Sequence, residues 1–111
     1  IAGKDVCLKT LEGCRVCLLD HVGALHCHSL RRCEVIVGSI ESSALLYDCH
    51  ECVIILATKQ LRLHDSENIS LHLHTLSSPV IEHCHHIVVS PYNLTYPHME
   101  AHWVVASLGA L

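Results

Sequence analysis

The segments Cys14-Arg-Val-Cys-Leu18, Cys33-Glu-Val-Ile-Val37 and Cys52-Val-Ile-Ile-Leu56 align position by position, and they begin at equal intervals along the chain. The column of their first residues continues with Ile69 and Ile87 at nearly the same interval. Apolar side chains alternate with period two inside these segments, which is typical of β-strands. Because the column recurs at a nearly constant spacing, the chain is predicted to stack several copies of one β-unit.

Five further columns of mostly apolar residues follow the same spacing and extend the repeat over most of the chain. They begin at Val6, Leu8, Leu11, Val16 and Leu18. A repeat of this length has room for two or three short strands and the corners between them. The simplest way to stack such units is a coil in which each turn lies about 4.8 Å above the previous one. We therefore expect an all-β fold, a right-handed parallel β-helix with a repeat of about 18 residues.

The length of 111 residues is sufficient for one domain and too short for two ordinary cores. The β-helix is expected over about residues 5–90, and residues 91–111 are interpreted as a capping tail. Prolines at the start of this tail exclude a central strand there, whereas residues 98–108 have helical spacing. We expect the tail, with its short helix, to cover the open end of the β-helix, because an uncovered end exposes unpaired strand edges. Since Ile1 is not an initiator residue, the chain is interpreted as a fragment of a longer protein.

The composition is abnormal in its eight cysteines, its twelve histidines and its lack of phenylalanine. The interior of a β-helix is narrow, so that it accommodates Val, Ile, Leu, Ala and thiol-form Cys better than Phe. Six cysteines are interpreted as small core residues of the columns: Cys14, Cys27, Cys33, Cys49, Cys52 and Cys84. Cys7 and Cys17 alternate outward, and their role stays open. Free thiols at this density imply a reducing compartment.

Disulfides and zinc are the alternative explanations of these cysteines. The pairs Cys14-Arg-Val-Cys17 and Cys49-His-Glu-Cys52 have the spacing of zinc ligands, but they lie in strand-like runs, where residues three apart point to opposite faces. A disulfide-rich domain would contain more glycine and fewer aliphatic residues than this chain. His83, His85 and His86 crowd one corner and are interpreted as a surface cluster. We therefore expect neither a structural metal nor disulfides.

The charge of the chain argues against two classes of partner, and its hydropathy argues against a membrane-spanning helix. The formal net charge is −4 and the chain has no basic run, which argues against nucleic acid and anionic membranes as main partners. No apolar stretch approaches the roughly 18 residues that a membrane-spanning helix needs. The first residues have the features of neither a signal peptide nor a transit peptide. We therefore expect a cytoplasmic protein.

Arg62 is the residue of greatest chemical interest among those predicted to point outward. It lies between Leu61 and Leu63, two core positions of one strand, so that alternation directs its guanidinium to the surface. Glu82 lies one coil later and two places further along, which makes it a diagonal neighbour at about 7–8 Å. Three further residues belong to this region: Lys59, Gln60 and His64. The pattern alone leaves two interpretations open, a guanidinium presented to a partner and an ordinary surface ion pair.

The same stretch resembles a known family. The run Leu56-Ala-Thr-Lys-Gln-Leu-Arg-Leu-His64 is similar to the signature of the tubulin-binding cofactor C domain. Ser78-Pro-Val-Ile-Glu82, Ser90-Pro-Tyr92 and Tyr96-Pro97 follow in the order and at the spacing typical of that family. The resemblance extends over about residues 7–108. Members of the family fold as right-handed β-helices, which is the fold expected from the columns.

The resemblance implies a GTPase activator rather than an enzyme with a nucleotide site of its own. In this family the arginine that matches Arg62 is an arginine finger, which enters the active site of a partner GTPase. Glu82 matches an acidic residue at the GTPase contact, and Gln60 matches one of two consecutive glutamines. Lys59 replaces the other glutamine, which bears on the choice of partner. Together with His64 these residues form the expected partner-binding site, and no cofactor or metal is expected.

Three functions are compatible with the sequence. The first is stimulation of GTP hydrolysis by β-tubulin, together with tubulin cofactors D and E, during assembly of the tubulin heterodimer. The second is activation of an Arf-like small GTPase, as in a family member linked to retinitis pigmentosa. The third is a non-catalytic centrosomal or cytoskeletal scaffold, similar to the actin-binding β-helix of the cyclase-associated proteins. We expect the first, in a monomeric cytoplasmic protein associated with the cytoskeleton.

Overall fold

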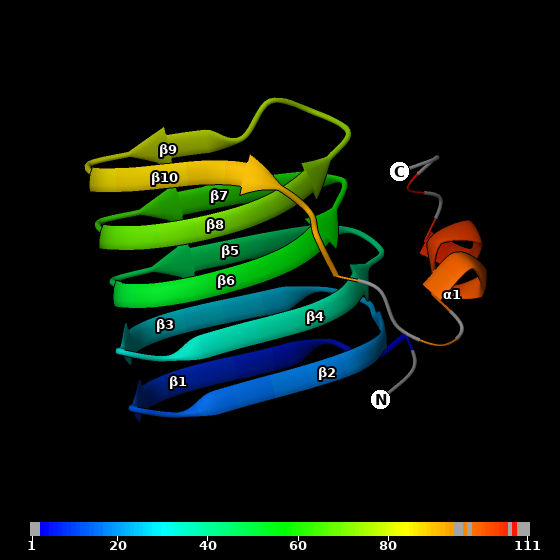
Figure 1. Cartoon of the computed structure of the whole chain (residues 1–111), viewed down its shortest axis with the longest axis horizontal. Coiled ribbons are helices and arrows are strands. Elements are labelled where there is room, and N and C mark those ends of the chain that lie inside the picture. Colours follow the sequence, from blue (N-terminus) through cyan, green and yellow to red (C-terminus); the bar gives the residue numbers. More distant parts are fainter. Residues whose placement is uncertain (1–2, 95–96, 98, 107, 109–111) are drawn as a thin grey trace.

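The computed structural model describes residues 3–94, 97, 99–106 and 108, which form ten strands and one helix (Figure 1). The elements are, in chain order, β1 Val6–Glu12, β2 Arg15–Val22, β3 Leu25–Arg31, β4 Glu34–Ile40, β5 Ser43–Tyr47, β6 His50–Thr58, β7 Gln60–His64, β8 Glu67–Thr75, β9 Val80–Glu82, β10 His85–Pro91 and α1 Met99–Ala106. Odd-numbered strands pair in parallel with successive odd-numbered strands, and even-numbered strands with successive even-numbered ones. One odd and one even strand make a coil, and the coils stack into a right-handed parallel β-helix, which confirms the predicted fold.

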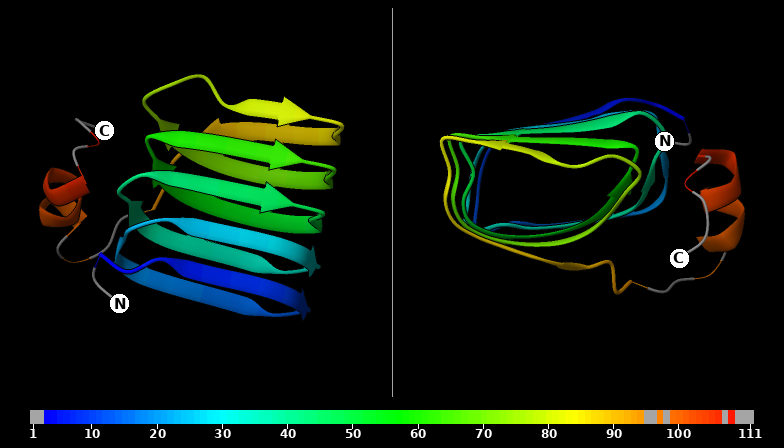
Figure 2. Two further views of the ribbon diagram at one scale, coloured as in Figure 1. Left: turned by 180° about the vertical axis from the view of Figure 1, so that it is seen from behind. Right: turned by 90° about the horizontal axis from the view of Figure 1, so that it is seen from above.

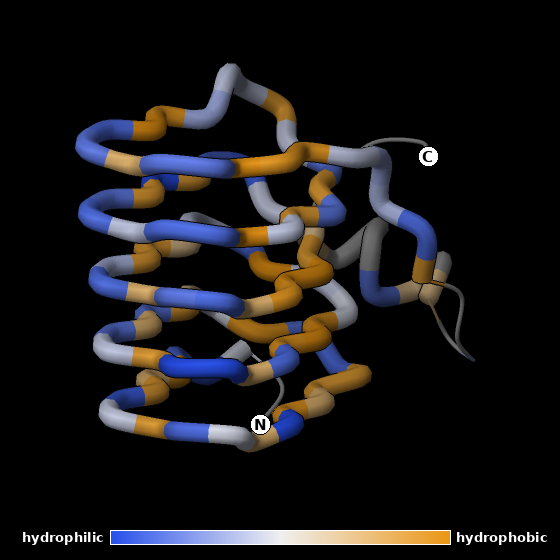
Figure 3. The backbone as a smooth tube through the Cα atoms, turned by 60° about the vertical axis from the view of Figure 1, so that its left-hand side comes forward, coloured by the Kyte–Doolittle hydropathy of each residue, from blue (hydrophilic) through white to orange (hydrophobic). Residues whose placement is uncertain are grey.

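The register of the strands reproduces the columns expected from the sequence. Glu34 pairs with Arg15 on one side and with Val53 on the other, so that the cysteines just before these residues stand above one another. Cys52 pairs with Ile69, which continues the column toward the last coil. The nearly constant interval between the members of a column is thus the register of successive coils. Figure 3 shows hydrophobic and hydrophilic residues recurring at similar places in each coil.

The core lies between the odd and the even strands and is best shielded in the middle of the stack. Leu46, Ile54 and Leu63 are 0% exposed there. Of the six column cysteines, Cys27, Cys33, Cys49 and Cys52 are buried, and Cys14 and Cys84 are half-buried in the end coils. Cys7 and Cys17 are exposed. In the last coil the core is open to solvent. Ile81 and Val89 occupy inward columns there, yet they are 38% and 50% exposed.

Each coil turns from its odd to its even strand at the corner opposite α1 (Figure 2). Nine residues other than glycine have a left-handed backbone conformation, and all belong to this corner: Thr10, Ser29, Arg32, Asp48, Glu51, Asp65, Asn68, His83 and His86. Such a residue costs roughly 1–2 kcal/mol, so contacts around the corner must compensate. Asp, Asn and His tolerate the conformation best, and five of the nine are of these types.

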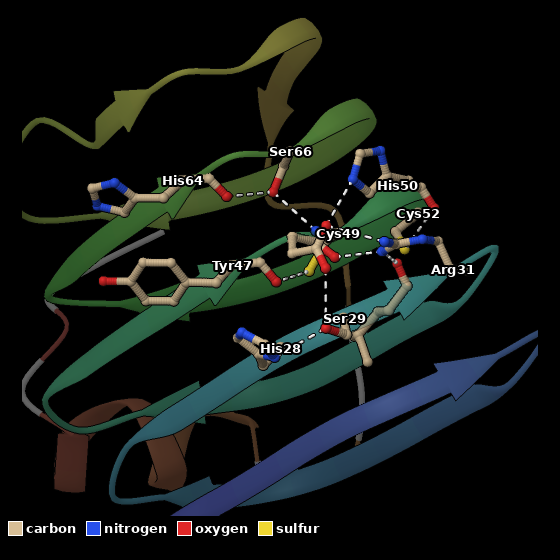
Figure 4. A network of polar contacts seen from close by, with 11 residues as sticks. His28, Ser29, Arg31, Tyr47, Cys49, His50, Cys52, His64 and Ser66 are labelled. Atoms are coloured by element: carbon tan, nitrogen blue, oxygen red, sulfur yellow. Dashed lines mark hydrogen bonds and ion pairs between the residues drawn. The ribbon is translucent and has the colours of Figure 1, made fainter.

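Asp48 shows how contacts between coils hold this corner, and Figure 4 labels its partners Ser29, Arg31 and His50. Its carboxylate accepts hydrogen bonds from Ser29 Oγ and Arg31 Nη2, both at 3.0 Å, and Nε2 of His50 lies 3.0 Å away. Arg31 also donates to the carbonyl oxygen of Asp48. Burial by itself raises the pKa of Asp48, but the hydrogen bonds from His50, Ser29 and Arg31 outweigh it and lower that pKa below its usual value.

The tail contains the expected helix, but the helix does not cover the open end. It contacts β2 and β4 at the side of the stack (Figure 1). The hydroxyl of Tyr92 donates to the carbonyl oxygen of Gly38 at 3.0 Å, which draws the tail away from the last coil. The buried residues of the tail pack against the stack: Met99, Ala106 and Leu108 cluster with Ala57. Within the described residues no strand pairs with the outer edge of the last coil, and this edge is blunted because β9 has only three residues.

Substitutions of Leu63 and Arg62 test which face of β7 is buried and which is exposed. Because Leu63 is 0% exposed, Leu63→Ala should lower the free energy of unfolding by about 2–5 kcal/mol through the cavity that it leaves. Arg62 is exposed, so Arg62→Ala should leave the melting temperature nearly unchanged. Urea and thermal unfolding of both variants, followed by circular dichroism, measure these effects. If Arg62→Ala were the variant that unfolds, the two faces would be assigned wrongly.

The lowered pKa of Asp48 predicts how its contribution to stability depends on pH. The carboxylate favours the folded state above the pKa of unfolded Asp, about 3.9, and this contribution is lost as the pH falls through the lower folded-state pKa. Asp48→Asn should therefore destabilise the chain near neutral pH, and its difference from the wild type should shrink below about pH 4. Urea midpoints of both chains measured across this range test the prediction.

Asp65 offers the matched control, because it lies at the same corner one coil later. Its side chain makes no hydrogen bond or ion pair within the described residues. Asp65→Asn should therefore cost less stability near neutral pH than Asp48→Asn does. Equal losses in both variants at every pH would mean that the network around Asp48 contributes nothing through charge.

Candidate functional site

Two columns of outward side chains run along the face that the odd-numbered strands form. The first column consists of Cys7, His26, Leu45, Arg62 and Val80. The second consists of Lys9, His28, Tyr47, His64 and Glu82. Because Arg62 pairs with Val80 and His64 with Glu82, Arg62 and Glu82 are diagonal neighbours on adjacent coils.

Arg62 differs from the other three arginines of the chain, because it has no anionic partner among the residues that the structure describes. Arg15 pairs with Glu34 at 2.9 Å, Arg31 with Asp48 at 3.0 Å and Arg32 with Glu12 at 3.2 Å. Within the described residues the guanidinium of Arg62 makes no hydrogen bond or ion pair, with Glu82 or any other residue. Its neighbours Leu61 and Leu63 are buried. A fixed strand therefore presents an unpaired guanidinium to solvent.

The backbone at the start of β7 is clamped by hydroxyl groups. The carbonyl oxygen of Lys59 accepts hydrogen bonds from Thr75 Oγ1 at 3.1 Å and from Ser77 Oγ at 2.9 Å. Thr58 Oγ1 donates to the carbonyl oxygen of Gln60 at 3.1 Å. Sequence reasoning missed this clamp, and its one signal is that Thr58 and Thr75 share a column. The clamp fixes the strand from which the outward residues of β7 project.

A shallow hollow adjoins Arg62 on this face. It is lined by Gln60, Leu61, Arg62, Ser77, Ser78 and Val80. The structure thus brings Gln60 together with Arg62, whereas His64 and Glu82 lie in the second column and Lys59 lies at the preceding corner. The expected site residues therefore share one region of the surface, but only Gln60 lines the same hollow as Arg62.

Aromatic rings stack along the second column. The rings of Tyr47 and His64 lie 4.9 Å apart with an interplanar angle of 13°. His26, from the first column, meets Tyr47 edge-on at 5.9 Å. Figure 4 shows Tyr47, His64 and His28 projecting to the same side. The hydroxyl of Tyr47 has no hydrogen-bond partner in the part of the chain that the structure describes. Tyrosine with a free hydroxyl is typical of protein contacts, so Tyr47 is a candidate site residue that sequence reasoning did not include.

The interior thiols are not poised as nucleophiles or metal ligands. Burial raises the pKa of Cys27, Cys49 and Cys52, to about 12 for Cys49, and only a thiolate attacks or binds metal. No group of three or more His, Cys, Asp or Glu among the described residues could hold a metal ion. The described helix α1 has eight residues, and no helix of the described chain is long and apolar enough to span a membrane.

Exposure predicts which cysteines react with a thiol reagent. Cys7 and Cys17 are exposed, so the folded chain should be alkylated rapidly by iodoacetamide at these two positions. Cys27, Cys49 and Cys52 should react only after unfolding, because burial shields them and keeps them protonated. Peptide mass spectrometry after labelling with and without urea measures both groups. Rapid labelling of Cys49 in the folded chain would contradict the core assignment.

The chain is similar to known proteins in sequence. The family model for "Tubulin binding cofactor C" matches residues 3–110. "Tubulin-specific chaperone C" of Mus musculus is 34% identical over 94 residues, which are 85% of this chain and 28% of that protein. "Tubulin-folding cofactor C" of Arabidopsis thaliana is 36% identical over 89 residues, which are 80% of this chain and 26% of that protein. The chain thus spans little more than a quarter of the length of these relatives.

A solved structure shares the fold. "Tubulin Binding Cofactor C from Leishmania major" matches with a TM-score of 0.70 and 27% sequence identity. The match covers 73% of this chain and 48% of that chain. The similarity in fold therefore agrees with the similarity in sequence.

Proposed function

The chain belongs to the tubulin binding cofactor C family, and from this premise we propose that it stimulates GTP hydrolysis by β-tubulin, with Arg62 as an arginine finger. The names of its relatives, a tubulin-specific chaperone and a tubulin-folding cofactor, support a role in tubulin folding. In this proposal the chain binds no nucleotide itself. It contributes one side chain to the active site of its partner.

The chemistry of phosphoryl transfer explains what this arginine does. As GTP is hydrolysed, negative charge spreads over the oxygens of the γ-phosphoryl group. A guanidinium supplied by a second protein stabilises this charge in the transition state. The guanidinium is planar, donates two parallel hydrogen bonds and stays protonated, in contrast to the point charge of a lysine ammonium. Such a finger raises the rate of hydrolysis by roughly 10³–10⁵.

The observation that carries the proposal is the unpaired state of Arg62 within the described chain, where the other arginines each have an ion pair. A guanidinium held by a carboxylate would have to leave it before reaching a phosphate. The clamp at Lys59 and the buried neighbours Leu61 and Leu63 already order the backbone. Only the side chain of Arg62 needs ordering on binding, which lowers the entropic cost of the contact.

The remaining residues of the two columns are proposed as the contact surface for tubulin. Gln60 beside the finger, Lys59 at the corner and Glu82 on the last coil offer polar contacts, while Tyr47 stacked on His64 offers ring surface. Aromatic and arginine side chains dominate the energy of many protein interfaces. The partner proposed here is the tubulin heterodimer in the cytoplasm, with tubulin cofactors D and E acting alongside.

Arg62→Ala should abolish the stimulation of GTP hydrolysis, a loss of roughly 10³-fold or more, and should largely preserve binding to tubulin. The reason is that a finger acts on the charge of the transition state, so its removal affects the rate more than ground-state affinity. Arg62→Lys should fail as well, because an ammonium does not reproduce the two parallel hydrogen bonds. The measurement is single-turnover GTP hydrolysis by tubulin with cofactors D and E, with binding determined separately by sedimentation.

Arg15→Ala is the matched control, because it removes an arginine from β2, on the opposite sheet, and should stimulate like the wild type. Glu82→Ala should weaken stimulation only in part, through binding or through the position of Arg62. An Arf-like GTPase serves as the parallel substrate. Full stimulation of both GTPases by Arg62→Ala would exclude the arginine-finger mechanism and leave the scaffold function.

A further inference from the structure

The loop between β8 and β9 carries Ser78-Pro79 close to Arg62, and the proposed function makes no use of this dipeptide. Residues 76–78 are exposed. Ser77 Oγ is engaged, because it donates to the carbonyl oxygen of Lys59. The hydroxyl of Ser78 has no partner within the described residues. The following proline holds Ser78 in an extended backbone conformation, so this hydroxyl has the accessibility and the sequence context that proline-directed protein kinases require.

Ser78 lies within reach of Arg62. Because Arg62 pairs with Val80, Ser78 lies only two residues before that partner, in the loop that leads into β9. Both side chains line the same hollow. A phosphoserine and an arginine that line one hollow can reach each other, and the guanidinium has no competing ion pair in the described chain.

We propose that a proline-directed protein kinase phosphorylates Ser78 and that the resulting phosphate pairs with Arg62. The kinase transfers the γ-phosphoryl group of ATP to the hydroxyl oxygen of Ser78: the new P–O bond forms, the bond to the leaving ADP breaks, and the hydroxyl proton passes to the catalytic base of the kinase. The product carries a charge of about −1.5 to −2 near neutral pH. Arginine binds such a phosphate through two parallel, charge-assisted hydrogen bonds.

The consequence of this pair rests on the proposed function: phosphorylation switches the arginine finger off. A guanidinium held by a phosphate on its own chain is not available to the γ-phosphate of a GTPase. In the unmodified chain the loop leaves Arg62 free, since Ser77 is turned to Lys59 and Ser78 carries no charge. The modification therefore changes the charge beside the finger without requiring the β-helix to move.

Ser90-Pro91 provides a control within the same chain. It is the same dipeptide, but Ser90 lies in β10, where it pairs with His72 of β8, on the sheet opposite Arg62. A strand that is hydrogen-bonded into a sheet is a poor fit for the cleft of a kinase, which binds an extended segment. We therefore expect modification of Ser78, and not of Ser90, in the folded chain.

The first experiment tests the ion pair without any GTPase. Phosphoserine is incorporated genetically at position 78, or at position 90 as control, in chains with Arg62 and with Arg62→Ala, and each phosphate is titrated by phosphorus NMR. At position 78 the second proton should be lost at lower pH when Arg62 is present, because a guanidinium favours the dianion. At position 90 the two chains should titrate alike. Identical titration of both chains at position 78 would overturn the pair.

The second experiment tests the site and the switch. Folded chain treated with ATP and a purified mitogen-activated protein kinase should yield the phosphopeptide of Ser78 and not that of Ser90. If the kinase phosphorylated other residues but not Ser78, the proposed modification site would be wrong. In the single-turnover assay, the chain with phosphoserine at position 78 should lose about tenfold or more of its stimulation, and Ser78→Ala should retain it.

The outcomes separate the two proposals. If the unmodified chain does not stimulate tubulin or an Arf-like GTPase, the proposed function is wrong, and the NMR titration still decides on the pair between phosphate and guanidinium. If the unmodified chain stimulates and the chain with phosphoserine at position 78 stimulates equally, the proposed function stands and the switch is wrong.

Discussion

Parallel hydrogen bonding between successive coils is the interaction on which the rest of this structure depends. It holds each residue above its counterpart in the coil before, so a column along the axis must be filled by side chains of similar width. A single Phe would widen one coil relative to its neighbours. The interior is therefore built mainly from Leu, Ile and Val, and from cysteines that burial keeps as neutral thiols.

The same register builds the candidate site on the outer face. Alternation along β7 turns Arg62 outward between two buried leucines, and stacking places rings from successive coils in contact. The hydroxyl clamp on Lys59 arises at the next corner, where Thr75 stands one coil beyond Thr58. No pocket for a ligand is needed for this arrangement. The site is a set of side chains held at fixed spacing on a rigid surface, which suits a contact with another protein.

The periodicity of the sequence was sufficient to predict the strands, their register and the outward direction of Arg62, because those depend only on spacing and alternation. It was insufficient for the corners, where Gly13 and the Asp, Asn and His residues are of types that favour a left-handed conformation but Arg32 and Glu51 are not. The position of the tail was predicted wrongly, because it depends on Tyr92 meeting a carbonyl group 54 residues earlier in the chain. The unpaired state of Arg62 and the ring stack depend on side-chain conformations that a pattern of residue types does not specify.

The tail also changes how the stack behaves as a whole. In a solenoid each repeat contacts mainly its neighbours, so that unfolding can begin at an end and spread one repeat at a time. Here Tyr92, which follows the last coil, bonds to the second coil, and His102 of α1 lies 3.7 Å from Asp20 of the first coil. The chain thus tethers its last coil to its first two. Loss of the last coil would release this tether as well, so the tail couples the two ends of an otherwise one-dimensional structure and favours cooperative unfolding over stepwise fraying.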